Sequence, residues 1–210
     1  QQASEALRVE LGVLAGVGIT WLRVEANTQS GSFQGRETID FAGSVQPAGG
    51  LFAEIVLPRR LKRLSLVPEL FYTAFKGHYA YDRTTNADSY TRGEVTLDYR
   101  YLRGNLLLRY RQPIGTSGSI FFNGGVGAGY AVRGVSRRVE SVRFYSQSST
   151  KEGLAFGTED RSEEVLLLGL GGRIKRLSGE VRAEIGDGFL NGIYQTSGTT
   201  RAFLLLGYHF

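Results

Sequence analysis

Residues 7–21 of the chain read LRVELGVLAGVGITW and alternate between two kinds of side chain. Every second residue from Leu7 to Trp21 is apolar, while the residues between them include two charges and three glycines. Successive side chains of a β-strand point to opposite faces, so this alternation predicts a strand. A typical strand has about five to six residues, but a tilted strand that crosses a bilayer needs about nine to eleven. The segment therefore predicts a membrane-crossing strand with an extension.

The same alternation recurs along the rest of the chain. It is found in residues 50–57, 64–75, 95–111, 119–132, 164–174, 179–186 and 201–210. In residues 95–111 the apolar positions change parity, which predicts a β-bulge near Tyr101–Leu102. No segment has helical periodicity.

The connections between these segments alternate in length. Short ones lie near residues 58–63, 112–119 and 175–179, and long polar ones span 24–43, 77–94, 134–163 and 187–199. Eight strands with this spacing predict an all-β fold: a single antiparallel eight-stranded up-and-down transmembrane β-barrel with short periplasmic turns and long extracellular loops. We expect residues 1–210 to form a single domain, with residues 1–6 as a periplasmic N-terminal extension.

The apolar positions are expected to face lipid, because aromatic residues then gather at both ends of the strands. The set near the long loops is Trp21, Tyr72, Tyr99, Tyr101 and Tyr130, and the set near the short turns is Tyr110, Phe122, Tyr208 and Phe210. Two aromatic girdles are typical of membrane barrels. A soluble lipocalin-like barrel, with the apolar positions inside, is the alternative.

The opposite positions carry charges of both signs. They are Arg8, Glu10, Glu54, Glu69, Arg109, Arg111, Arg173, Glu180, Arg182, Glu184 and Arg201. An eight-stranded barrel is just wide enough for side chains to fill it, so we expect paired Arg and Glu to close the lumen structurally. Glycines such as Gly125, Gly127 and Gly129 would make room for the long arginines.

The composition excludes several function classes. Among 210 residues there is no Cys and there are only two His, which argues against thiolate sites, disulfides and His-rich metal centres, and no cofactor is expected. The formal charge is +5, but the arginines are spread along the chain, so nucleic acid is not an expected partner. No signal-peptide pattern is visible, and we expect a bacterial outer-membrane location with that peptide already removed.

The last strand carries a further pattern, with Leu204, Leu206, Tyr208 and the terminal Phe210 on one face. This ending resembles the C-terminal signal that the barrel-assembly machinery recognises in outer-membrane proteins. That machinery is therefore an expected partner during biogenesis.

Two stretches, residues 49–77 and 101–130, are similar to the PorT-like family of outer-membrane β-barrels. The matching residues are Gly50, Phe52, Ala53 and Glu54 in the first strand, and Leu66, Pro68, Glu69, Leu70 and Tyr72 after the short turn. RGNLLLRY, residues 103–110, departs from the family's pattern. The resemblance implies an eight-stranded barrel of Gram-negative outer membranes and no defined activity, although some relatives are linked to protein secretion and surface motility.

The sequence favours a non-catalytic barrel that serves as a scaffold, anchor or accessory subunit of a cell-envelope complex. Outer-membrane lipid, lipopolysaccharide and a protein partner are its expected contacts. The candidate partner residues lie in the third long connection: Arg137, Arg138, Arg143, Phe144 and Tyr145. Arginine and aromatic residues are enriched at interface hot spots.

Two other functions stay open. A lipid A-modifying enzyme would need a catalytic group such as His78 with Ser89 and Asp82, or paired acids such as Glu54 and Glu69. A small porin or ligand-binding barrel would need an open lumen.

Overall fold

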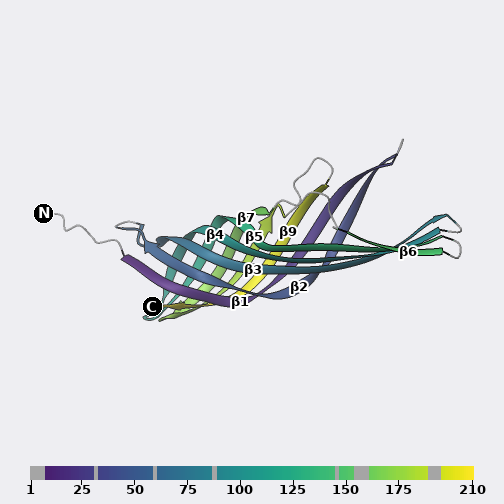
Figure 1. The fold of residues 1–210 in the computed structure, drawn as a ribbon. Helices are drawn as coiled ribbons and strands as arrows, with labels where there is room; N and C mark the ends of the chain where they lie inside the picture. The colour runs from purple at the N-terminus through teal and green to yellow at the C-terminus, as the bar shows by residue number, and fades with distance from the viewer. Residues whose placement is uncertain are drawn as a thin grey trace.

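The computed structural model of the protein describes residues 8–30, 33–58, 61–86, 89–144, 147–153, 161–188 and 195–210. Its strands are β1 (Arg8–Ser30), β2 (Phe33–Val56), β3 (Leu64–Asn86), β4 (Ser89–Ile114), β5 (Gly118–Phe144), β6 (Gln147–Gly153), β7 (Ser162–Ile174), β8 (Leu177–Gly186) and β9 (Gln195–His209). All strands except β6 pair in chain order, and β1 pairs with β9 to close the ring (Figure 1). The predicted antiparallel eight-stranded up-and-down barrel is confirmed, and β6 pairs with β5 alone among the described strands.

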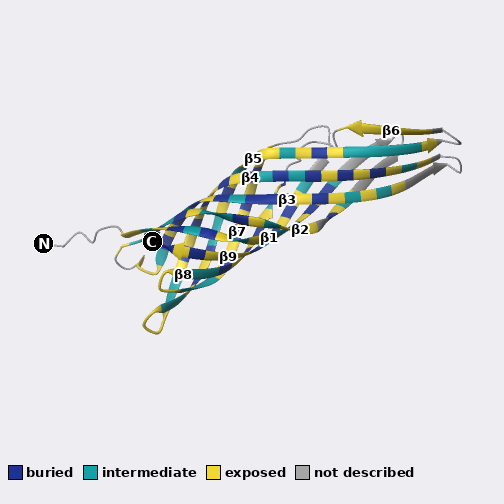
Figure 2. Cartoon of the chain, turned by 60° about the horizontal axis from the view of Figure 1, so that its bottom comes forward, coloured by how far each residue is buried: buried dark blue, intermediate teal, exposed yellow. Residues whose placement is uncertain are grey.

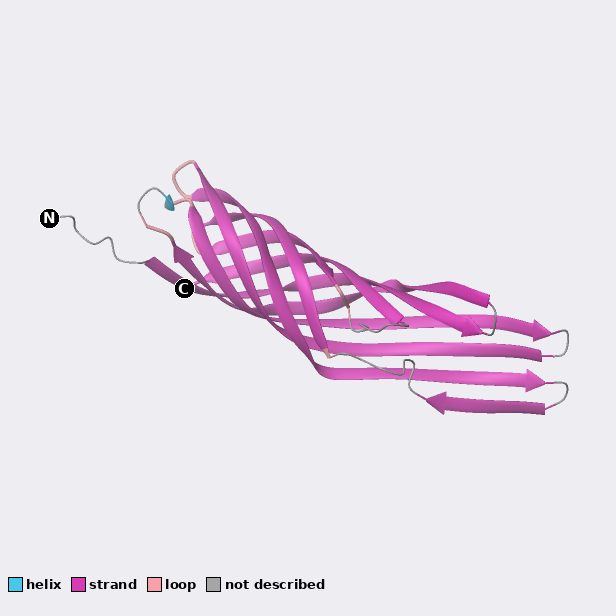
Figure 3. Ribbon diagram, turned by 90° about the horizontal axis from the view of Figure 1, so that it is seen from above, coloured by secondary structure: helices cyan, strands magenta, loops and turns pink. Residues whose placement is uncertain are grey.

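The two ends of the barrel differ (Figure 3). At the short-turn end, brief connections join β2 to β3, β4 to β5 and β7 to β8. At the hairpin end, strands continue well past the barrel as paired ribbons. Among the described residues, no helix is long and apolar enough to span a membrane.

The predicted orientation of the two strand faces is confirmed through the barrel. Buried and exposed residues alternate along the strands (Figure 2). The exposed apolar side chains include Leu11, Leu51, Leu70, Leu106, Phe122, Leu166, Leu168, Val181, Leu204 and Leu206. A continuous apolar band therefore covers the outside of the barrel.

Inward glycines make the space that the sequence pattern predicts. Gly127 pairs with Asn105, and Gly129 pairs with Arg103, on the neighbouring strand β4. A methyl group at Gly129 would overlap the aliphatic part of the Arg103 side chain. Glycine is required here by the close approach of a large luminal side chain.

The prediction of long loops at residues 24–43 and 77–94, and over much of 134–163, is wrong. β1 and β2 stay paired up to Ser30 and Phe33, β3 and β4 up to Asn86 and Ser89, and β5 and β6 up to Phe144 and Gln147. The described backbone of these segments is therefore regular strand despite their polar composition. Residues 154–160 and 189–194 of the predicted connections, and the predicted extension 1–6, lie outside the described residues.

The predicted bulge is displaced onto the neighbouring strand. Arg100 pairs with Arg133 and Tyr101 pairs with Ala131, so the extra residue is Val132 on β5. β4 therefore keeps one parity throughout. As a consequence Tyr99 and Tyr101 point inward, at 1% and 2% exposure, and do not belong to the outer aromatic girdle.

These inward aromatics help to form an apolar core that extends from the upper end of the barrel into the hairpins. It joins the β1–β2 hairpin to β3, β4 and β5 through Leu22, Val24, Phe41, Phe75, Val95, Leu97, Tyr99, Tyr101 and Ala131. Phe41 and Tyr79 bring the two hairpins into ring contact, with centroids 5.9 Å apart. The hairpins are thus held together by their own hydrophobic packing.

Candidate functional site

The lower lumen, nearest the short turns, is filled by a group of ion pairs. Glu54 on β2 accepts bonds from Arg109 at 3.1 Å and from Arg111 at 2.6 Å, both on β4 across the lumen. Glu10 on β1 accepts a bond from Arg173 on β7 at 2.5 Å. Charged groups that leave water need such partners, and the alternating strands supply them from opposite walls.

The middle of the lumen is organised around Arg182 on β8. Its guanidinium donates two bonds to Glu69 on β3, at 2.8 and 2.9 Å, and a third to Glu180 at 2.8 Å. Asn105 donates to the same Glu69 at 3.2 Å. The Arg182 side chain has no exposed surface. A bidentate pair of this kind is among the stronger polar contacts in proteins.

The upper lumen contains two further pairs. Arg103 lies 2.7 Å from Glu184, and Arg201 lies 2.5 Å from Glu163. The guanidiniums of Arg103 and Arg182 approach the Phe71 ring at 5.3 and 5.4 Å, which adds cation–π attraction. Charge pairs and packed rings therefore occupy the barrel from its lower to its upper end.

Ten of the eleven predicted luminal residues lie in or at the edge of this network. The exception is Arg8, whose side chain is 74% exposed and pairs with Glu10 at the rim of the short-turn end. Arg8 precedes the closed part of the barrel, so its parity alone does not bury it.

The sequence reasoning missed two charged members of the network, Arg103 and Glu163. Arg103 shares the parity of Arg109 and Arg111, which were expected in the lumen, so the alternation over residues 102–111 could have found it. Glu163 was assigned to a loop, although it alternates with Val165 and Leu167, which also point inward.

A second polar cluster lies in the hairpins. Arg138 on β5 donates to the Tyr81 hydroxyl at 2.8 Å, and both Tyr81 and Arg138 bond to Glu140. The hydrogen bond from Tyr81, with support from Arg138, holds the pKa of Glu140 below its ordinary value. This cluster fixes the β5 part of the hairpins against β3.

The predicted partner residues of the third connection belong to the β5–β6 hairpin. Arg137 pairs with Glu152 on β6 at 2.7 Å, with both side chains mostly exposed. Arg138 is held by the cluster above, and Arg143 is exposed. The side chain of Phe144, and Tyr145 as a whole, lie outside the described residues.

The candidate catalytic groups do not come together in the described part of the chain. His78 and Asp82 are both exposed on β3, and four residues of strand separate their Cα atoms by about 13 Å. The side chain of Ser89 lies outside the described residues. Glu54 and Glu69, the alternative acids, are each held by arginine.

One group in the described residues has the composition of a metal site. Glu10, Glu54 and His209 offer ligand atoms within 4.8 Å of one another. The carboxylates already have Arg173 and Arg111 as cationic partners, so the group fits an ion-pair network better than a metal centre. His209 contacts the Ser178 hydroxyl at 3.3 Å, and its ring lies 3.7 Å from Glu10.

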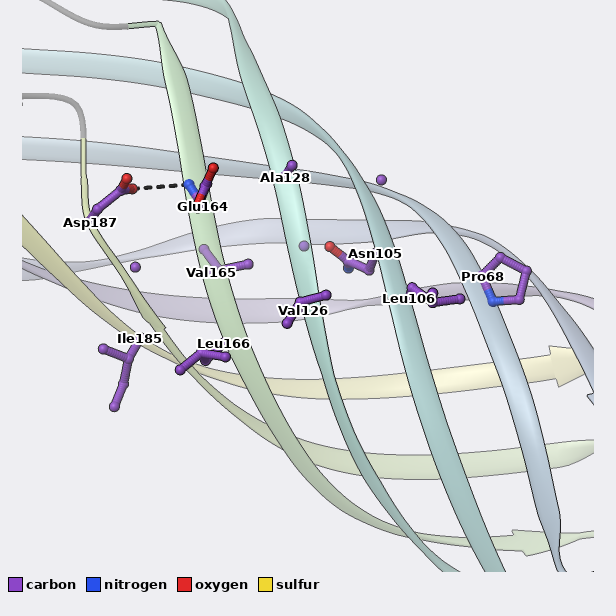
Figure 4. Close-up of a pocket in the computed structure, with 13 residues that line it drawn as sticks. Pro68, Asn105, Leu106, Val126, Ala128, Glu164, Val165, Leu166, Ile185 and Asp187 are labelled. Atoms are coloured by element: carbon purple, nitrogen blue, oxygen red, sulfur yellow. Dashed lines mark hydrogen bonds between the residues drawn. The ribbon is translucent and has the colours of Figure 1, made fainter.

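The outer wall has a hollow of about 780 Å³ near the hairpin end (Figure 4). Its apolar walls include Leu106, Val126 and Leu166. Its upper edge is acidic, with Asp187 accepting a bond from the Glu164 backbone at 3.0 Å. No histidine, serine or arginine lines it among the described residues.

No known family model and no curated protein matches the chain. Among solved structures, it is similar to the attachment invasion locus protein Ail of Yersinia pestis, at 12% identity and a TM-score of 0.33, over 94% of this chain and 98% of that one. It is also similar to Neisserial surface protein A, at 10% identity and a TM-score of 0.35, over 93% and 97%. The Escherichia coli outer membrane protease OmpT gives 7% identity and a TM-score of 0.39 over the whole of both chains. These are likenesses of fold, and membership of the PorT-like family stays a prediction.

Proposed function

We propose that this chain is an integral outer-membrane barrel that binds a protein partner through its projecting hairpins. In this role it is a non-catalytic scaffold, anchor or accessory subunit of a cell-envelope complex. The observation that carries the proposal is the shared apolar core of the hairpins, which joins Leu22, Phe41 and Phe75 from the upper end of the barrel into the hairpins that extend from it. A membrane anchor alone does not need a separately packed structure outside the bilayer.

The membrane location is supported by the outer surface of the barrel. Leu166, Leu206 and Ile174 are 64%, 69% and 67% exposed, within a band that surrounds the barrel. Soluble monomers rarely expose contiguous apolar patches larger than a few hundred Å². Trp21 and Tyr130 at the upper edge, with Tyr208 and Phe210 at the lower edge, fit two membrane interfaces.

The filled lumen supports a role other than that of a porin. The buried chains of Arg103, Arg109, Arg182 and Arg201 reach across the interior and pair with glutamates from other strands. A water path would have to displace these pairs and leave buried charges without partners.

The exposed basic residues of the β5–β6 hairpin are the proposed contact surface. Arg137 and Arg143 lie on β5, and Lys151 lies on β6, all exposed to solvent. Their charge favours a partner with an acidic surface, because complementary charge guides association and orientation.

The test is a pull-down from native membranes with the variant R143E/K151E. We expect the variant to assemble as a barrel and to lose at least one protein that co-purifies with the wild type. The matched control is K62E/R63E, which reverses two charges at the short-turn end. Unchanged co-purification of every protein by R143E/K151E, and by a second variant with residues 137–160 replaced by a Gly-Ser linker, would refute the docking role.

A companion measurement addresses the enzyme alternative. Lipid A from cells with and without the protein is compared by mass spectrometry. A change in the number of acyl chains would replace the docking proposal with a lipid-modifying activity.

A further inference from the structure

The outer wall has a second hollow, of about 1110 Å³, at the short-turn end. One row of paired residues crosses it: Ile120 on β5, Gly172 on β7, Gly179 on β8 and Leu206 on β9. The two glycines form its floor, and the flanking Ile and Leu form two of its walls. Ile174 and Leu177 close it toward the turn.

The glycines of this floor are not required by the backbone. A methyl group at Gly172 would meet its nearest atom at 3.7 Å, and one at Gly179 would meet its nearest atom at 4.0 Å. Larger residues would fit at both positions and would favour a strand, since glycine destabilises a strand interior. The sequence thus leaves open a space that side chains could fill.

The adjacent turn has a residue with a side chain where the backbone conformation favours glycine. Lys175 has a φ of +54°, a conformation that normally favours glycine or asparagine in a tight hairpin. The chain therefore has lysine where glycine would relieve strain, and glycine where a side chain would fit. Departures from local rules of this kind are expected at functional sites.

The charged residues that line the hollow are basic, which indicates an anionic ligand. Lys175 and Arg176 form its basic edge, and Arg176 donates to the Tyr208 hydroxyl at 3.4 Å. Arg173 also lines the hollow but bonds to Glu10. No acidic residue lines this hollow among the described residues, in contrast to the Glu164 and Asp187 edge of the upper hollow.

We propose that this hollow binds one glycerophospholipid with an anionic head group. An acyl chain lies over Gly172 and Gly179, and the phosphate lies at Lys175 and Arg176. The site rests on the proposed membrane location, where the short-turn end meets the periplasmic leaflet, but not on the docking role. Basic side chains at an interface recognise anionic head groups, and the apolar hollow selects a lipid rather than a free phosphate.

The test is native mass spectrometry of the detergent-purified protein, titrated with phosphatidylglycerol or with phosphatidylcholine of the same acyl chains. We expect tighter binding of phosphatidylglycerol. The variant K175Q/R176Q should lose this preference, by a factor of about five for each basic residue. The variant G172L/G179L should weaken the binding of both lipids, because leucine fills the hollow.

Two matched controls accompany these variants. Arg63 donates to the Tyr110 hydroxyl at 3.4 Å, so K62Q/R63Q removes a similar basic pair at another short turn. Gly124 also has room for a methyl group, with its nearest atom at 3.7 Å, and G124L adds leucine outside the hollow. Both controls should bind as the wild type does.

Three results would overturn the proposal. They are equal affinity of the wild type for the two lipids, the same loss in K62Q/R63Q as in K175Q/R176Q, and unaltered binding by a folded G172L/G179L. Flotation of the wild type with vesicles tests the membrane location separately. A protein that floats but shows no lipid preference therefore overturns only the lipid site.

Discussion

Replacing Glu69 by alanine should destabilise the barrel more than most single changes. Glu69 is 5% exposed and accepts two bonds from Arg182, whose side chain is fully buried. Without Glu69, Arg182 keeps Glu180 as its carboxylate partner but loses both of these bonds. Removing one partner of a buried ion pair costs about 3–5 kcal/mol, because the remaining charge stays out of water.

The assay is urea unfolding of the protein in detergent micelles, followed by the change in gel mobility or by circular dichroism. With a slope of about 2–3 kcal/mol per M, the expected loss lowers the unfolding midpoint by about 1–2.5 M. The double variant E69A/R182A should cost less than the sum of the two single changes, since the two residues act as a pair.

The matched control is Glu152→Ala. Glu152 pairs with Arg137 at 2.7 Å, close to the distance of the luminal pair, but both side chains are about 60% exposed. Exposed pairs contribute about 0–1 kcal/mol, so the midpoint should hardly move, as it should for Arg143→Ala. Equal effects of E69A and E152A would refute a dry, paired lumen.

Three further outcomes are expected. Arg103→Ala should lower the unfolding midpoint as strongly as Glu69→Ala, whereas Arg8→Ala should leave it unchanged. A larger effect of Arg8→Ala than of Arg103→Ala would show that the buried lumen has been assigned to the wrong residues. Planar-bilayer recordings of pure protein should show no stable conductance, and reproducible single-channel steps would contradict a closed lumen. Glu140 has a lowered pKa, so its stabilising effect is present above its ordinary value of 4.5 and is lost as the pH falls through its lowered pKa. The protection of amide hydrogens in the β5–β6 hairpin, corrected for the pH dependence of intrinsic exchange, should therefore fall at acid pH, and a Tyr81→Phe variant should show lower protection already at neutral pH.

The barrel could be predicted because one face of each strand is apolar. Residues such as Leu166, Leu168 and Leu170 alternate with inward positions, and a period of two leaves no other face for them. The pairing of Arg with Glu inside the lumen could also be predicted from the alternation, since charged residues of both signs share the inner face of a narrow barrel.

The hairpins could not be predicted in the same way, because their strands are rich in polar residues and alternate less regularly between apolar and polar residues than the strands of the barrel. Val95, Leu97, Tyr99 and Tyr101 look like lipid-facing residues in the sequence, yet they pack inward above the barrel. Parity alone does not tell an apolar core from a lipid-facing band when a strand continues past the membrane. The bulge at Val132 on β5 depends on strand pairing, which no single segment encodes.

The central claim is that the apolar positions face lipid and the charged positions face a closed lumen. Because the chain has no Cys, spin labels can be attached at single introduced cysteines along β9, from Phe203 to Tyr208, in protein reconstituted into vesicles. Power saturation with oxygen, which enters lipid, and with a water-soluble nickel complex reports the surroundings of each label. We predict high oxygen access at 204, 206 and 208, low access to both reagents at 203, 205 and 207, and hence a period of two. Oxygen access that is highest at 203, 205 and 207, or nickel access along the whole strand, would contradict the account.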